Sequence, residues 1–159
     1  MKYLFITIIS LLFCTMSMSQ TNYESYTLSI NCWMCGNVKI TIEKKNDSLK
    51  LDYLFAHRIE RPDGSLIIDT SKTITADEWK GFKDIIEKGN FWKFPESTPG
   101  DIAEDGADWL LEGHIPGDGY SFSGWVPHRN TLLYEAGAYL VNLTGMDRLK
   151  KLIDEASRE

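Results

Sequence analysis

The sequence predicts an α+β fold, in which an antiparallel sheet carries its helices on one face. Short segments early in the chain alternate polar and apolar residues with period two, which is typical of strands that bury one side. Three later segments carry apolar residues at helical spacing. The connections between the early strand segments are too short for parallel crossovers, so we expect antiparallel pairing.

Four strands are expected before the first helix. They cover residues 25–31, 38–42, 49–61 and 65–71. In the first of them Tyr26, Leu28 and Ile30 share one side, as a half-buried strand requires. The third ends at the turn signal Pro62-Asp63-Gly64. Each strand follows its predecessor closely, so these segments predict a four-strand meander.

One helix should follow the meander. Thr75 and Glu78 have the spacing of a capping box, in which a hydroxyl and a carboxylate satisfy the first free amides of a helix. The apolar stripe that follows consists of Trp79, Phe82, Ile85 and Ile86. We expect this helix to end at Gly89 and to lie on the sheet.

The second half of the chain should add a hairpin and two helices. The hairpin is formed by residues 109–115 and 120–125, which flank a Pro-Gly-Asp-Gly turn. Apolar stripes over residues 132–143 and 146–157 predict the two C-terminal helices. The aromatic segment 91–95 looks too irregular for a helix, and the acidic segment 96–107 should be an exposed loop.

The N-terminus has the order of a secretory signal. One lysine precedes an apolar run over residues 3–13, which is shorter than the ~20 residues of a membrane-spanning helix. Ser17 and Ser19 suit cleavage before Gln20, so we expect residues 1–19 to be removed and residues 20–159 to form a single periplasmic or secreted domain. A lipoprotein anchored through Cys14 is the alternative, which the bulky Phe13 disfavours.

Charge and motifs exclude several classes of function. Without the signal, 16 Lys and Arg stand against 23 Asp and Glu, a formal charge of −7. Nucleic acids and anionic membranes require a basic surface, so neither is an expected partner. We expect no stable membrane insertion after signal removal. The sequence also lacks a phosphate-binding glycine loop and a dinucleotide fingerprint, so no cofactor is expected.

Cys32 and Cys35 enclose Trp33 and Met34 between two predicted strands. A reactive thiolate would need a helix N-terminus, and a structural zinc would need two further ligands. A disulfide in an oxidising compartment is therefore favoured over a metal site or a redox pair. Trp33 and Met34 could pack onto the sheet or form an exposed contact.

The second half of the chain resembles a group of uncharacterised bacterial proteins. The shared motifs are F-W-x-x-P at residues 91–95, D-G-x-x-W-x-x-E-G at residues 105–113, Tyr120, and W-x-P at residues 125–127. Those proteins commonly carry a histidine and an arginine where this chain has Ser121 and Gly124. The group has no established activity, so the resemblance implies none.

A non-enzymatic binding domain is the favoured function. Its aromatic-rich face would comprise Trp109, Tyr120 and Trp125, with Trp33 and Met34 as a second contact, and its partner would be a protein or a glycan.

The alternative is a small glycan-directed hydrolase. Its carboxylates would be Asp105, Asp108 and Glu112, because glycosidases need two carboxylates across a cleft. The histidines are scattered singly, and no nucleophile motif accompanies them.

Overall fold

The structure, a computed structural model, describes residues 22–32, 36–57, 66–93 and 106–155. This part of the chain forms a six-stranded antiparallel sheet with three helices, which confirms the predicted α+β fold. The strands are β1 (Tyr23–Cys32), β2 (Gly36–Lys45), β3 (Ser48–His57), β4 (Leu66–Thr73), β5 (Ala107–Ile115) and β6 (Asp118–Trp125). The helices are α2 (Ala76–Lys88), α3 (Leu132–Thr144) and α4 (Asp147–Glu155), with a short 3-10 helix η1 (Phe91–Lys93).

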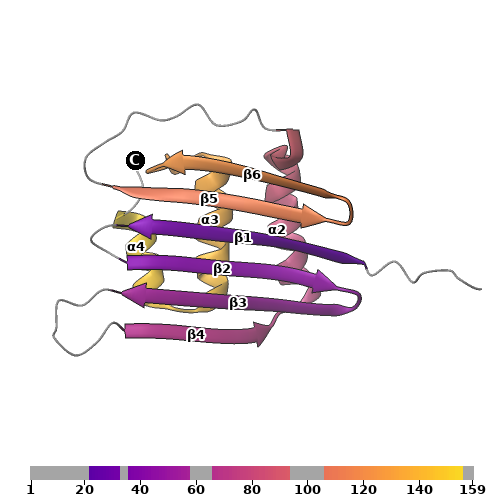
Figure 1. Ribbon diagram of the computed structural model, residues 1–159, viewed down its shortest axis with the longest axis horizontal. Helices are drawn as coiled ribbons and strands as arrows, with labels where there is room; N and C mark the ends of the chain where they lie inside the picture. The colour runs from indigo at the N-terminus through magenta and orange to yellow at the C-terminus, as the bar shows by residue number, and fades with distance from the viewer. Residues whose placement is uncertain (1–21, 33–35, 58–65, 94–105, 156–159) are drawn as a thin grey trace, which may run out of the picture.

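The strand order is β4-β3-β2-β1-β5-β6. The first four strands form the predicted meander, and the β5–β6 hairpin joins the sheet beside β1. Helix α2 follows β4 at one edge and crosses the back of the sheet, and η1 lies near the other edge (Figure 1). Strand β1 is therefore central, and its Leu28 lies opposite both Ile40 and Leu111.

Helix α2 begins with the capping box that its sequence predicts. The Thr75 amide donates to Glu78 Oε2 at 2.7 Å, and the Glu78 amide donates to Thr75 Oγ1 at 3.1 Å. These two bonds satisfy amides that the first helical turn leaves free. The helix buries Trp79, Phe82 and Ile86 against the sheet, so the predicted apolar stripe is its core face.

The core lies between the sheet and the helices. Its centre is Tyr26 of β1, whose ring makes edge contacts with Phe82 at 5.2 Å and Phe91 at 5.8 Å. Phe91 belongs to η1, in a segment whose sequence looked too irregular for a helix. The 3-10 turn brings Phe91 into the core, where it is fully buried.

Helix α3 approaches the sheet closely at Gly137. A Cβ atom at this position would lie 2.5 Å from Trp109 Cζ3, so only glycine lets the helix backbone pass over the indole. Helix α3 ends at Gly145, which has a φ of 73°. Within the described residues, no helix has both the length and the apolar character that crossing a membrane requires.

The other face of the sheet carries none of the described helices. In Figure 1 the helices lie behind the strands, and the front face belongs to the side chains that alternate with the core residues. We call this surface the open face. Its centre is polar: the hydroxyls of Thr27 and Thr41 lie 3.0 Å apart across β1 and β2.

Candidate functional site

One cross-strand row of the open face ends at a hollow. Because antiparallel partners point to the same side of a sheet, the registers place one residue from each strand in a single row. This row, which we call the end row, consists of Trp125, Asp108, Asn31, Asn37, Ala56 and Ile67. Six strands spaced at ~4.8 Å give it a length of roughly 24 Å.

The hollow has a volume of about 400 Å³, and we call it the end hollow. The described residues that line it are Asn31, Cys32, Gly36, Asn37, Ala56, Gly106, Asp108 and Trp125. Five of them belong to the end row; of the others, Cys32 ends β1, Gly36 begins β2 and Gly106 directly precedes β5. The end hollow therefore lies on the open face, where the β1–β2 hairpin meets the start of β5.

The polar members of the end hollow come from three neighbouring strands. Asn31 of β1 lies opposite both Asn37 of β2 and Asp108 of β5. All three side chains are exposed. Two carboxamides and one carboxylate thus stand side by side, and together they can both donate and accept hydrogen bonds.

Backbone geometry fixes Trp125 at one end of the end row. The next residue, Val126, has a φ of 43°, and its amide donates to the Ala107 carbonyl at 2.9 Å. A Cβ atom on Gly106 would lie 2.9 Å from Trp125 Nε1, so the glycine lets the indole pack against the backbone. The indole N–H is buried, and it has no hydrogen-bond partner within the part of the chain that is described.

The predicted aromatic-rich face does not exist as one surface. Trp109 lies opposite Gly124, one residue before Trp125, so the two tryptophans point to opposite faces of the sheet. Trp109 is fully buried and stacks on Tyr134 at 6.3 Å. Tyr120 lies on the same covered face, perpendicular to Phe91 at 5.2 Å. Of the three predicted residues, Trp125 alone reaches the open face.

Two predicted binding residues and one predicted disulfide partner fall in the segment between β1 and β2. Trp33 and Met34 lie outside the described residues. Cys32 is the last residue of β1 and lines the end hollow, whereas Cys35 lies outside the described residues. The Cys32–Cys35 disulfide therefore stays a prediction.

The candidate carboxylates are only partly brought together. Asp108 and Glu112 share the open face of β5, but they are four residues apart, which corresponds to roughly 13 Å along a strand. Carboxylates of glycosidases are about 5–9.5 Å apart. Asp105 lies outside the described residues. The geometry of Asp108 and Glu112 does not match that of a glycosidase pair.

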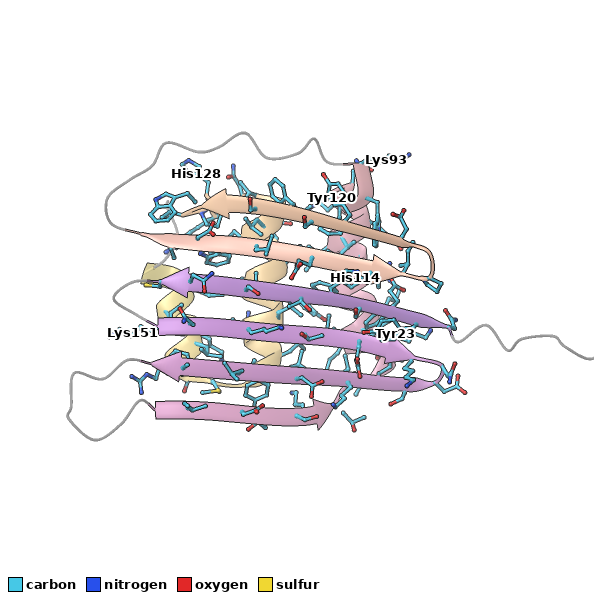
Figure 2. The ribbon with its side chains drawn as sticks, in the orientation of Figure 1. Tyr23, Lys93, His114, Tyr120, His128 and Lys151 are labelled. Carbon is cyan, nitrogen blue, oxygen red and sulfur yellow. The ribbon has the colours of Figure 1, made fainter. Side chains whose placement is uncertain are left out.

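The two histidines whose side chains the structure describes, His114 and His128, do not form a cluster. His114 and His128 lie at opposite ends of the β5–β6 hairpin, as Figure 2 shows. Within the described ranges, no three His, Cys, Asp or Glu side chains are grouped as a metal site would require.

A charged cluster lies on the covered side of the sheet, remote from the open face. Tyr26 donates to Glu24 Oε1 at 2.6 Å, and Lys83 of α2 lies 2.6 Å from the same oxygen and 3.0 Å from the Tyr26 hydroxyl. Burial, reinforced by the bond to Glu24, raises the pKa of Tyr26 to about 12. Burial disfavours the charge of Lys83, but its bonds to Glu24 and Tyr26 outweigh this and raise its pKa. The cluster links α2 to β1.

Sequence reasoning missed Asn31, Asn37 and Ala56. Because neighbouring residues of a strand point to different faces of a sheet, the predicted strands already place Asn31 and Asn37 on the face away from Ile30 and Val38. What the sequence does not contain is the register that sets these residues beside Asp108. That pairing joins segments far apart in the chain.

The protein therefore has an α+β fold whose described helices cover one face of the sheet, and the end hollow is a polar site on the other face. No protein-family model matches the chain, and no curated protein sequence matches it. The resemblance to uncharacterised bacterial proteins therefore stays a prediction.

Proposed function

We propose that this protein is an exported, non-enzymatic binding domain whose ligand is a glycan held in the end hollow. One observation carries the proposal: the end hollow combines two carboxamides, a carboxylate and an indole on a face that no described helix covers. The three polar side chains, Asn31, Asn37 and Asp108, are exposed and so accessible to a ligand.

The chemistry of these groups suits a sugar. A sugar hydroxyl both donates and accepts hydrogen bonds; an asparagine side chain does the same, and a carboxylate accepts. The indole of Trp125 offers apolar aromatic surface to the C–H face of a ring. The volume of about 400 Å³ lies within the usual range of small-ligand pockets, which is about 300–1,000 Å³.

The hydrolase alternative has less support. It needs a second carboxylate near Asp108, and Glu112 is roughly 13 Å away along β5. The end hollow supplies one carboxylate among its described residues. A single exposed carboxylate can orient a bound sugar without hydrolysing it.

The test is binding of the mature chain to an array of glycans, followed by calorimetry with the best ligand. Trp125→Ala should weaken binding at least about tenfold, since aromatic anchors in binding sites commonly contribute more than 1 kcal/mol. Asn37→Ala should also weaken it, and this exposed side chain can be removed without opening the core.

The matched control is Glu112→Gln. Glu112 lies on the same strand and the same face as Asp108 but outside the end hollow. Glu112→Gln should leave the glycan affinity within about twofold of that of the unmodified protein, because Glu112 does not line the end hollow. The proposal would be refuted if the protein bound no glycan on the array. It would also be refuted if Glu112→Gln and Asn37→Ala lost affinity equally while both variants remained folded by circular dichroism.

A further inference from the structure

Acidic side chains outnumber basic ones among the described residues of the open face. Asp108 is the only acidic or basic side chain among the described residues that line the end hollow. The charged Asp, Glu and Lys side chains that the registers place on the open face are Glu43, Asp52, Asp69, Asp108, Glu112, Lys39, Lys45 and Lys50. Five carboxylates thus stand against three lysines, of which Lys50 is already paired with Asp52 at 2.8 Å and Lys45 lies at the end of β2 remote from the end hollow.

Among the described residues of the open face, Lys39 is the cation nearest to the end hollow in the strand register. It follows Asn37 by two residues on β2, roughly 7 Å along the strand, and its side chain is exposed. Lys39 therefore partly offsets the negative potential at the end hollow without lining it. His114, which the register also places on the open face, lies six residues from Asp108 near the other end of β5.

An indole and a carboxylate form a suitable environment for a cationic group. Trp125 and Asp108 are direct cross-strand partners, so one ligand substituent can reach both. An ammonium group is attracted to the face of a tryptophan ring and to a carboxylate. An anionic ligand would meet Asp108 with no basic side chain among the described lining residues.

We propose that the end hollow selects sugars that carry a free amine over N-acetylated and acidic sugars. This selectivity rests on the proposed glycan binding. Asp108 and Trp125 would hold the ammonium group, and Asn31 and Asn37 would bond to the ring hydroxyls. The ligand class is thus an amino sugar with an unsubstituted, protonated amine.

The test compares three monosaccharides: glucosamine, N-acetylglucosamine and glucuronate. Each is titrated into the mature protein, labelled with ¹⁵N, at a mildly acidic pH where the amine is protonated. Glucosamine should bind about three- to tenfold more tightly than N-acetylglucosamine, since exposed cation–π contacts and ion pairs each contribute modestly. Glucuronate should bind most weakly.

Two variants change the charge in opposite directions. Asp108→Asn should remove the preference for glucosamine, whereas Lys39→Gln should increase it, and added salt should reduce it in the unmodified protein. Glu112→Gln is the control for the general acidity of the open face, and it should change the preference much less than Asp108→Asn.

The outcomes separate this inference from the function on which it rests. Equal affinity for glucosamine and N-acetylglucosamine, with both lost in Trp125→Ala, would overturn the amine preference and leave glycan binding standing. Equal effects of Asp108→Asn and Glu112→Gln would also overturn it, because the preference would then be non-specific attraction to an acidic surface. If no sugar bound in the titrations or on the array, both the amine preference and the proposed glycan binding would be overturned.

Discussion

The hydroxyl of Tyr26 should make the protein sensitive to alkaline pH. Its pKa in the folded protein is about 12, against 10.0 for an ordinary tyrosine. A raised pKa means that the protonated form is favoured by folding, so its contribution is complete below pH 10 and is lost as the pH rises toward 12. Two pKa units correspond to about 2–3 kcal/mol. The pKa of Lys83 is also raised, so its contribution is lost in the same direction.

Denaturant unfolding below pH 10 and then at increasing alkaline pH measures this loss. Tyr26→Phe keeps the buried ring and removes the titrating hydroxyl, so its stability should fall less steeply above pH 10. Identical alkaline slopes for the variant and the unmodified protein would mean that Tyr26 does not carry the effect.

Helix α2 should owe its stability to its buried stripe more than to its cap. Phe82 is fully buried and contacts Tyr26, so Phe82→Ala should cost about 3–5 kcal/mol, because it loses apolar burial and leaves a cavity. Thr75→Ala removes one capping bond and should cost about 1 kcal/mol. Chemical denaturation monitored by circular dichroism measures both values.

Lys80→Ala is the control for α2. Lys80 is exposed and pairs with Asp84 one turn away, a contact worth at most a few tenths of a kcal/mol. A cost below about 1 kcal/mol for Phe82→Ala would place the stripe outside the core and contradict the packing described above.

The β1–β2 hairpin should be closed by a disulfide. Cys32 lies opposite Gly36 in the register, and Cys35 is covalently adjacent to Gly36. One step along the chain moves a Cα atom by 3.8 Å, so Cys35 lies one step from the cross-strand partner of Cys32. This proximity is compatible with the 4.4–6.8 Å that a disulfide needs between its two Cα atoms. Replacement of both cysteines by serine should cost no more than roughly 2 kcal/mol, since the closed loop is short.

Thiol counting on the exported protein decides the state of the hairpin. We expect no alkylated thiol before reduction and two afterwards in the mature chain, which keeps Cys32 and Cys35 after Cys14 is removed. Two thiols that react without reduction, or stoichiometric zinc in protein purified without added metal, would exclude the disulfide.

At the scale of the whole molecule, the elements were predictable and the site was not. The capping box and the apolar stripe of α2 are local patterns, and the structure realises both. Period-two alternation likewise predicted the meander. Both patterns depend on residues a few positions apart, where backbone geometry alone decides which side chains share a face.

The end row depends instead on the pairing of β1 with β5. This register sets Asn31 beside Asp108 and turns Trp109 into the core, and the β5–β6 register turns Trp125 to the open face beside Asp108. A shift by one residue would reverse every one of these directions. Sequence reasoning grouped Trp109, Tyr120 and Trp125 by residue type, whereas the sheet separates them by strand parity.

Export is a property of the whole chain, and we predict a mature N-terminus at Gln20. The apolar run over residues 3–13 is followed by Ser17 and Ser19, the small residues that a signal peptidase requires. The mature protein would then carry a formal charge of −7 and no lipid. Intact mass and N-terminal sequencing of material secreted by an expression host measure the cut directly. Ser19→Phe should block or shift the cut, whereas Cys14→Ser should leave it unchanged. A mature species that begins with an acylated Cys14 would instead establish a lipoprotein, held at a membrane by its acyl chains.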